Sequence, residues 1–264
     1  MSELIGLRGV TVLTGGHEAI ADVDLSVPEG ASTVIMGPSG CGKSTLLKVA
    51  AGLMPPDRGA VLLRGEDLDG FSEQRMREFR GTNGFVFQDG ALWENKTIFD
   101  NLALPLQVHH PDLGPGEIGR RVARMLERGG LSDSPALRPA QLSGGERKIA
   151  SFLRAAIVEP TIVFLDEPTL SIDYRMAERI TAMIRDLKLR GCTILVVTHD
   201  ARLASGIADR LVVLEAGRVL AEGPFDEVKR STDERVHSVL ARVLGEIASF
   251  DTDLLALLDG DRGS

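Results

Sequence analysis

The stretch GPSGCGKST, residues 37–45, decides the fold of this chain. It fits the pattern G-x-x-x-x-G-K-[ST] and lies between a predicted strand, residues 32–36, and a predicted helix that begins at Lys43. Glycines let backbone N–H groups turn toward phosphate oxygens, and the start of the helix adds the positive end of its dipole. We expect Lys43 to reach the β- and γ-phosphates of a nucleotide and the Ser44 hydroxyl to ligate Mg²⁺. The alternative is a glycine-rich turn with an exposed lysine.

Composition limits what the chain can be. Its 264 residues are 43% hydrophobic, enough for one large domain or a core with a small subdomain. The formal net charge is −8 and no Lys/Arg-rich run occurs, which argues against a nucleic-acid partner. Two cysteines are too few for a disulfide framework and indicate a reducing compartment. We expect neither a signal peptide nor a membrane helix, because the apolar runs are far shorter than about 20 residues.

Strand and helix patterns alternate along the chain, which predicts an α/β fold with a parallel sheet covered by helices. Strands are expected at residues 23–27, 32–36, 60–65, 84–88, 161–166 and 193–200. The predicted division is 1–87, the first part of a nucleotide-binding core; 88–158, a helical insertion; 159–230, the second part of the core; and 231–264, a helical tail.

Polar residues follow the ends of several predicted strands. The run TIVFLDEP, residues 161–168, places Asp166 to hold Mg²⁺ and Glu167 to polarise an attacking water. Gln88 and His199 also follow predicted strands. Ligands bind at the carboxyl edge of an open α/β sheet, so these side chains predict a catalytic site beside the phosphate loop. An acidic pair alone would indicate only a turn.

The segment LSGGE, residues 142–146, begins another predicted helix. Ser143 and Glu146 fit a capping box, so a well-capped helix is the simplest interpretation. Each interior glycine nevertheless costs a helix about 1 kcal/mol relative to alanine, while it leaves backbone N–H groups uncovered. A second anion-binding helix start suggests that a γ-phosphate is clamped from another side.

With these motifs in this order, the chain resembles the ABC ATPases over about residues 4–225. The resemblance implies a P-loop NTPase (RecA-like) core with an antiparallel β subdomain and a helical subdomain, and ATP and Mg²⁺ as cofactors. It also implies a head-to-tail homodimer that encloses two ATP molecules. The implied catalytic residues are Glu167, His199 and Gln88; the metal-binding residues Ser44, Gln88 and Asp166; and the nucleotide-binding residues Gly37, Pro38, Ser39, Gly40, Cys41, Gly42, Lys43, Ser44 and Thr45, with Ser143, Gly144 and Gly145 of the second copy.

Within that family, a transport ATPase is the leading interpretation, because the chain lacks the long insertions or tandem halves of the DNA-repair and translation members. The segment FQDGALW…TIFDNLALPL, residues 87–106, resembles the ATPases of MCE-type (Mla-like) phospholipid transporters. That resemblance implies permease subunits, MCE-domain and small accessory subunits, and a peripheral place on the cytoplasmic side of the inner (cell) membrane. Alternatives are a lipoprotein-releasing or solute-import ATPase and, less favoured, a non-transport ABC ATPase acting on nucleic acid.

Four further expectations concern single features. Cys41 is expected to be a reactive thiol, or else a small filler residue. Trp93 is expected beside the groove for a membrane subunit, or else in the core. The apolar face from Val236 through Leu258 is expected to dock on a second copy or on its own core. No aromatic residue precedes Phe71, so the residue that contacts adenine is left open.

Overall fold

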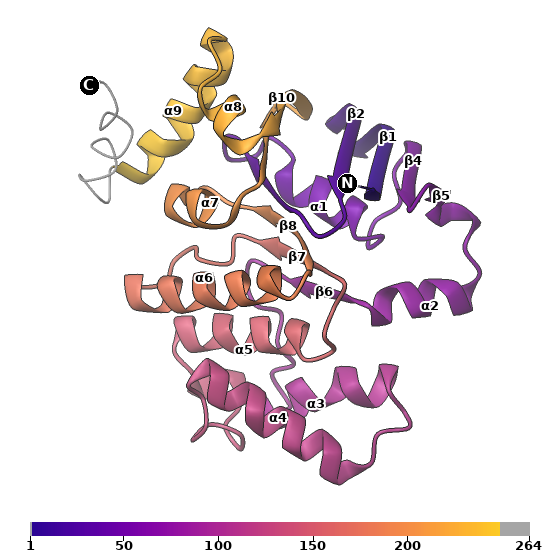
Figure 1. Ribbon diagram of the computed structural model, residues 1–264, viewed down its shortest axis with the longest axis vertical. Coiled ribbons are helices and arrows are strands. Elements are labelled where there is room, and N and C mark those ends of the chain that lie inside the picture. Colours follow the sequence, from indigo (N-terminus) through magenta and orange to yellow (C-terminus); the bar gives the residue numbers. More distant parts are fainter. Residues whose placement is uncertain (1, 249–264) are drawn as a thin grey trace.

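The computed structural model describes residues 2–248 (Figure 1). Within that range two sheets form. The antiparallel sheet has the order β2-β1-β4-β5, and the larger sheet has the order β10-β9-β3-β8-β7-β6. In the larger sheet all neighbours are parallel except β9 and β10. The strands are β1 (Glu3–Thr14), β2 (His17–Pro28), β3 (Ser32–Met36), β4 (Arg58–Leu63), β5 (Glu66–Asp67), β6 (Asn83–Val86), β7 (Ile162–Asp166), β8 (Thr193–Val197), β9 (Arg210–Glu215) and β10 (Arg218–Pro224).

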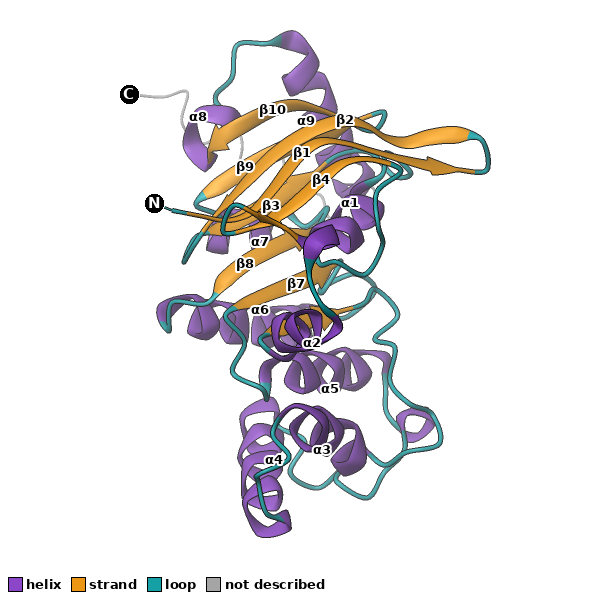
Figure 2. Cartoon of the chain, turned by 90° about the vertical axis from the view of Figure 1, so that its right-hand side faces the viewer, coloured by secondary structure: helices purple, strands orange, loops and turns teal. Residues whose placement is uncertain are grey.

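The helices are α1 (Lys43–Ala50), α2 (Glu73–Gly81), α3 (Ile98–His109), α4 (Pro115–Gly129), α5 (Gly144–Ala156), α6 (Tyr174–Leu189), α7 (Ala201–Ile207), α8 (Phe225–Lys229) and α9 (Glu234–Ala248). Two 3₁₀ turns in the described chain are η1 (Leu68–Gly70) and η2 (Pro139–Gln141). Helix α1 packs against strands of both sheets, and Figure 2 shows α3, α4 and α5 grouped beyond the β6 edge of the larger sheet. The P-loop fold with mixed sheets and a helical part agrees with the predicted fold class.

The central strands β3, β7 and β8 are buried along their whole length. This explains why they read as continuous apolar runs: parallel strands covered on both faces have no solvent side. Two clusters of buried side chains form the core. One contains α1 and the antiparallel sheet, and the other contains α3 to α7 and the start of α9. Because β3, β6, β7 and β8 are parallel, their carboxyl ends meet at one edge of the sheet.

Sequence patterns did not assign β1, β9 or β10, and they shortened β2. In β1 the register shifts between Leu7 and Val10, around Gly9, whose φ is +56°. Such an irregularity breaks the period-two alternation on which strand recognition depends.

The start of the C-terminal tail packs on its own chain. Val236, Val239 and Val243 of α9 are at most 2% exposed and belong to the same core cluster as β9. The described part of the tail therefore supports docking on the chain's own core. The predicted apolar positions from Phe250 to Leu258 lie outside the described residues, as does the rest of the tail beyond Ala248.

Across residues 2–248, the helices are too short or too polar for any of them to span a membrane. The four-part division of the chain remains a prediction; residues 88–158 contain α3, α4 and α5.

Candidate nucleotide site

The phosphate loop connects the carboxyl end of β3 to the start of α1. Gly42, the N-cap of α1, has φ +102°, and a Cβ there would lie against the carbonyl oxygen of Ala19 and the side chain of Ile20. Only glycine satisfies both the backbone angle and the space. No side chain within the described chain caps this helix start, and no acidic residue lies in its first turn. The N–H groups of the first turn are therefore available to an anion.

The Lys43 ammonium lies at the centre of the loop. Its Nζ donates to the carbonyl oxygens of Gly37 at 2.8 Å and Pro38 at 2.9 Å, and it lies 3.1 Å from Nε2 of His199. An ammonium has no acceptor, so Nε2 of His199 must accept and the ring proton lies on Nδ1. The loop carbonyls thus hold the Lys43 ammonium beside a cavity of about 850 Å³, which Lys43 also lines.

That cavity has the size and lining that a nucleotide needs. It is bounded by loop glycines, by the start of α1 and by polar side chains that follow β7 and β8. Gly40 has φ +77°, and a Cβ there would meet nothing within 4 Å, so the backbone is open to a ligand. The predicted residues that line the cavity are Ser39, Gly40, Gly42, Lys43, Ser44, Thr45, Gln88, Glu167 and His199.

Ser44 and Asp166 form the predicted metal pair. The Ser44 hydroxyl donates to Oδ1 of Asp166 at 2.8 Å, and Asp166 is only 3% exposed. Burial raises the pKa of the Asp166 carboxyl, against the lowering effect of the Ser44 hydrogen bond. Mg²⁺ prefers oxygen ligands and is commonly held by one or two carboxylates together with substrate phosphates. The two adjacent oxygens, on residues that line a second cavity of about 620 Å³, fit that ion.

Glu167 contacts His199 through both its carboxylate oxygens. Oε1 pairs with Nδ1 of His199, and Oε2 accepts the backbone N–H of His199 at 3.2 Å. Glu167 has φ +48°, an uncommon backbone angle for a residue with a side chain. Its own N–H donates to the carbonyl of Val197 at 2.9 Å. The strand ends of β7 and β8 therefore bring the predicted base and histidine together.

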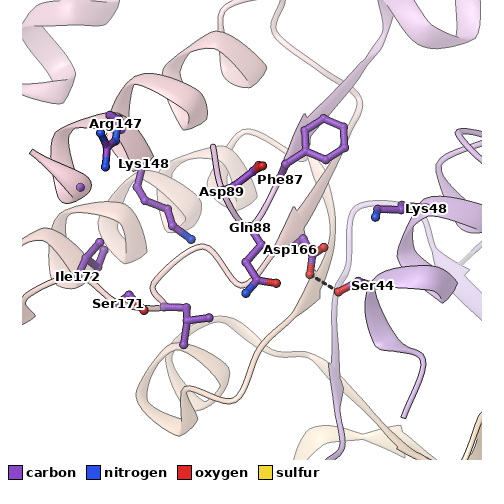
Figure 3. A pocket seen from close by; sticks show the side chains of 12 residues that line it. Ser44, Lys48, Phe87, Gln88, Asp89, Arg147, Lys148, Asp166, Ser171 and Ile172 are labelled. Atoms are coloured by element: carbon purple, nitrogen blue, oxygen red, sulfur yellow. Dashed lines mark hydrogen bonds between the residues drawn. The ribbon is translucent and has the colours of Figure 1, made fainter. Parts of the chain in front are cut away.

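Gln88 lines this second cavity as well as the first. Figure 3 shows its amide pointing into the second cavity beside the Ser44–Asp166 pair. The same cavity is lined by Gly144 and Lys148 of α5, so it connects the nucleotide side of the sheet to the helical part.

The helix start at LSGGE is arranged differently. The N–H and the hydroxyl of Ser143 donate to Oε2 of Glu146 at 2.8 and 2.7 Å, and the Glu146 N–H donates to Oγ of Ser143 at 3.3 Å. Ser143 and Gly145 are absent from the described linings of both cavities. A Cβ on Gly144 would meet nothing within 4 Å, whereas one on Gly145 would lie 2.8 Å from Met176 Cγ. The structure does not bring this helix start to its own chain's nucleotide cavity.

Gly37, Pro38 and Cys41 belong to the phosphate loop but are absent from the described lining of the nucleotide cavity. Gly37 and Pro38 supply carbonyls to Lys43, and a Cβ on Gly37 would lie 2.8 Å from Cys41 Sγ. Cys41 is 7% exposed, and burial raises the pKa of its thiol. The expectation of a reactive thiolate is therefore wrong, because desolvation outweighs the effect of Lys43 and the helix start. Cys41 is a packed filler residue.

The structure narrows two questions that the sequence left open, namely the place of Trp93 and the residue that contacts adenine. Trp93 is 45% exposed, so it is not a core tryptophan; its ring stacks near the Arg154 guanidinium, with 5.0 Å between Cζ and the ring centroid. Thr14 and Ala19 line the nucleotide cavity, and its described lining contains no aromatic residue.

Lys148 lies at the site but is not among the residues predicted from the sequence. Its Nζ donates to the carbonyl oxygen of Glu167 at 2.7 Å. A signal was present: Lys148 lies four residues before the buried Phe152, on the apolar face of its helix. A lysine on an apolar helix face is a candidate for a buried contact.

A phosphate loop and a Glu–His pair that line one cavity, together with a buried Ser–Asp pair that lines the second, define a P-loop nucleotide-hydrolysing protein. The family model described as "ABC transporter" matches residues 20–170. Methionine import ATP-binding protein MetN 1 of Rhodococcus jostii (strain RHA1) is 36% identical over 96% of this chain and 75% of its own length. The sulfate/thiosulfate import ATP-binding protein CysA of Mesostigma viride is 36% identical over 92% of this chain and 68% of its own length.

Solved structures agree with these matches. The ATP-binding cassette MJ0796, in a dimeric post-hydrolysis state bound to ADP and Pi, has a TM-score of 0.78 and 31% identity, over 84% of this chain and 98% of its own. The chain belongs to the ABC transporter family, and it is an ATPase that uses ATP and Mg²⁺. It spans 75% and 68% of the length of the two curated relatives named above.

Proposed function

We propose that this chain is the ATP-hydrolysing subunit of a solute importer and drives transport through separate permease subunits on the cytoplasmic side of the membrane. The observation that carries the proposal is the match to relatives named as import ATPases for methionine and for sulfate or thiosulfate, which extends over 96% and 92% of this chain. This favours the solute-import alternative over the phospholipid interpretation.

The site geometry supports a defined division of roles. Lys43 and the open start of α1 would hold the β- and γ-phosphates, and Ser44, Asp166 and Gln88 would hold Mg²⁺, which supplies charge neutralisation of the phosphates when bound. Glu167 would accept a proton from the attacking water, because its carboxylate lines the same cavity. His199 would orient that carboxylate through Nδ1.

We further propose that two copies assemble head to tail, so that Ser143, Gly144 and Gly145 of one copy face the γ-phosphate held by the other. The exposed helix start of α5, with open space at Gly144, supports this arrangement. The dimeric state named for the similar cassette MJ0796 also supports it.

A second candidate, phospholipid transport with an MCE-type system, rests on the resemblance of the segment FQDGALW…TIFDNLALPL and of the tail STDERVHSVL, residues 231–240, to those ATPases. In the structure the first segment runs from the carboxyl end of β6 into α3 and exposes Trp93. A membrane subunit could contact that side chain in either kind of transporter, so the first segment does not separate the two candidates.

Purification of the native complex from membranes separates them. Solute import predicts a permease that co-purifies with a solute-binding receptor, and ATP turnover that rises when methionine or sulfate is added with that receptor. Co-purification of an MCE-domain protein, with ATP-dependent phospholipid movement between bilayers, would replace solute import with the second candidate.

The proposed base has a direct test. Glu167→Gln keeps the size of the side chain and removes its basicity, so hydrolysis is expected to fall about 10²- to 10⁴-fold while MgATP binding persists. Glu178→Gln, at an exposed position on α6, is the matched control and is expected to retain the wild-type rate. A wild-type rate in Glu167→Gln, measured in the assembled complex, would remove Glu167 from this role.

A further inference from the structure

Lys148 is a buried cation that the proposed roles do not use. It is 8% exposed, and its ammonium donates to the main-chain carbonyl of Glu167 at 2.7 Å. Lysine is almost never fully buried unless its charge has a partner. Figure 3 shows the side chain extending from α5 into the cavity that Ser44, Gln88 and Asp166 also line.

The Lys148 ammonium contacts the main chain of Glu167, which has an uncommon backbone angle. Glu167 has φ +48°, a strained backbone angle for a residue with a side chain, which persists only where the surrounding structure holds it. The peptide groups on both sides of the Glu167 Cα are held: its N–H donates to Val197 O at 2.9 Å, and its carbonyl accepts from Lys148. With this backbone angle, the Glu167 carboxylate contacts His199.

Packing alone does not call for a lysine at this position. Burial lowers the pKa of the Lys148 ammonium, while Glu167, Asp166 and Asp89 act to raise it. A whole buried ion pair can commonly be replaced by apolar residues of similar volume without loss of stability. The charge at position 148 therefore calls for a role other than filling space.

The position of Lys148 on helix α5 links its contact with Glu167 to the segment proposed to face a second copy. The helix begins at Gly144, in the segment proposed to face a second copy's nucleotide, and Lys148 lies about one turn later. Further along, Arg154 donates to the carbonyls of Ala91 at 2.7 Å and Gly90 at 3.2 Å, just after Gln88. The residues between them are buried, so the helix is packed as one rigid body.

We propose that Lys148 is a positioning residue that holds the left-handed backbone of Glu167 and thereby makes the aim of the catalytic carboxylate depend on the placement of helix α5. The inference rests on the proposed role of Glu167 as the base. It assigns a mechanical link between the helix start that would meet the second copy and the carboxylate that would activate water in the same chain.

The test is the Lys148→Met variant of the full chain, with kcat and KM for ATP measured beside the Kd for MgATP. Turnover is expressed per MgATP-binding site, so an unfolded fraction does not enter. We expect kcat to fall at least about tenfold with Kd within about twofold of wild type, the signature of an interaction that acts on the chemical step. Lys229→Met, at an exposed position on α8, is the control and is expected to match wild type.

A conservative variant sharpens the result. Lys148→Gln keeps a hydrogen-bond donor on a side chain one bond shorter, so its kcat is expected to recover to within about threefold of wild type. If Lys148→Met yields no MgATP-binding protein, Lys148→Leu takes its place as the variant without a donor: a kcat reduced at least about tenfold at unchanged Kd supports the inference, and a wild-type kcat or a weakened Kd with unchanged kcat overturns it.

The two proposals fail separately. A wild-type kcat in Lys148→Met, with Glu167→Gln inactive, would overturn the positioning role and leave Glu167 as the base. Hydrolysis at the wild-type rate in Glu167→Gln would instead remove the premise on which the role of Lys148 depends.

Discussion

The starts of α1 and α5 are both glycine-rich, yet they differ in whether side chains of the protein cap their first backbone N–H groups. The start of α1 has Gly42 as its N-cap, with neither a capping side chain nor an acidic residue in its first turn within the described chain. The start of α5 has Ser143 and Glu146 in a reciprocal capping box. The α1 start therefore depends on a ligand to satisfy its N–H groups, whereas α5 begins with most of its own requirements met.

Their surroundings differ in the same sense. The α1 start carries Lys43 and borders the cavity of about 850 Å³, so one copy supplies a nearly complete phosphate site. The α5 start is a preformed surface with open space at Gly144. Under the proposed function, the first helix start binds a nucleotide and the second meets a nucleotide that another copy already holds.

The largest expected effect is on the α1 side. Lys43→Ala is expected to weaken MgATP binding at least about a hundredfold, since charge-assisted hydrogen bonds to the phosphates are worth about 1.5–3 kcal/mol each. Isothermal titration against MgATP measures it, with the exposed Lys229→Ala as the control. Binding within a few-fold of wild type in Lys43→Ala would mean that the open helix start, without the lysine, holds the phosphates.

Alanine at each of the two α5 glycines gives a matched pair. Gly144→Ala meets no neighbour, so it is expected to stabilise the single copy by about 0.5–1 kcal/mol while it lowers ATP hydrolysis in the assembled complex. Gly145→Ala places its Cβ against the side chain of Met176 and is expected to destabilise the fold by about 1–3 kcal/mol.

Urea unfolding and ATP turnover of the two variants check these expectations. Full turnover in Gly144→Ala would mean that no ligand enters the open space at Gly144. The start of α5 would then have no role in ATP hydrolysis.

The smallest effect concerns the capping box. Hydrogen bonds from the Ser143 hydroxyl and N–H hold the pKa of Glu146 below its ordinary value of 4.5. The charged form therefore contributes stability that is fully present above pH 4.5 and is lost as the pH falls through the lower folded-state pKa. Glu146→Gln is expected to destabilise the chain by a few tenths of a kcal/mol at pH 7, and the difference should vanish once the pH falls below the folded-state pKa of Glu146. A difference that grows toward low pH would have the wrong sign.

Sequence patterns predicted the parts of this molecule that local rules govern. The buried strands β3, β7 and β8 are continuous apolar runs, and the polar residues that follow them meet because parallel strands end at one edge. The Ser44–Asp166 and Glu167–His199 contacts follow from that geometry.

The remainder depends on contacts between distant parts of the chain. Lys148 reaches a main-chain carbonyl, which no side-chain motif marks. Cys41 was misjudged because its burial depends on how the β9–β10 connection covers the loop, where Gly217 N–H donates to Cys41 O at 3.0 Å. Two curved antiparallel pairs, β1 with β2 and β9 with β10, contain register shifts that hide their alternation.

Mixing two inactive variants tests the central claim most directly, namely that one nucleotide is held by the α1 start of one copy and the α5 start of another. Lys43→Ala disables the first, and Gly144→Glu places a carboxylate at the second without a clash in its own chain. Each variant alone should be inactive. Their equimolar mixture should regain about one quarter of the wild-type rate, because half of the randomly formed two-fold dimers are mixed and each mixed dimer holds one complete site. A mixture as inactive as its components would contradict the shared site.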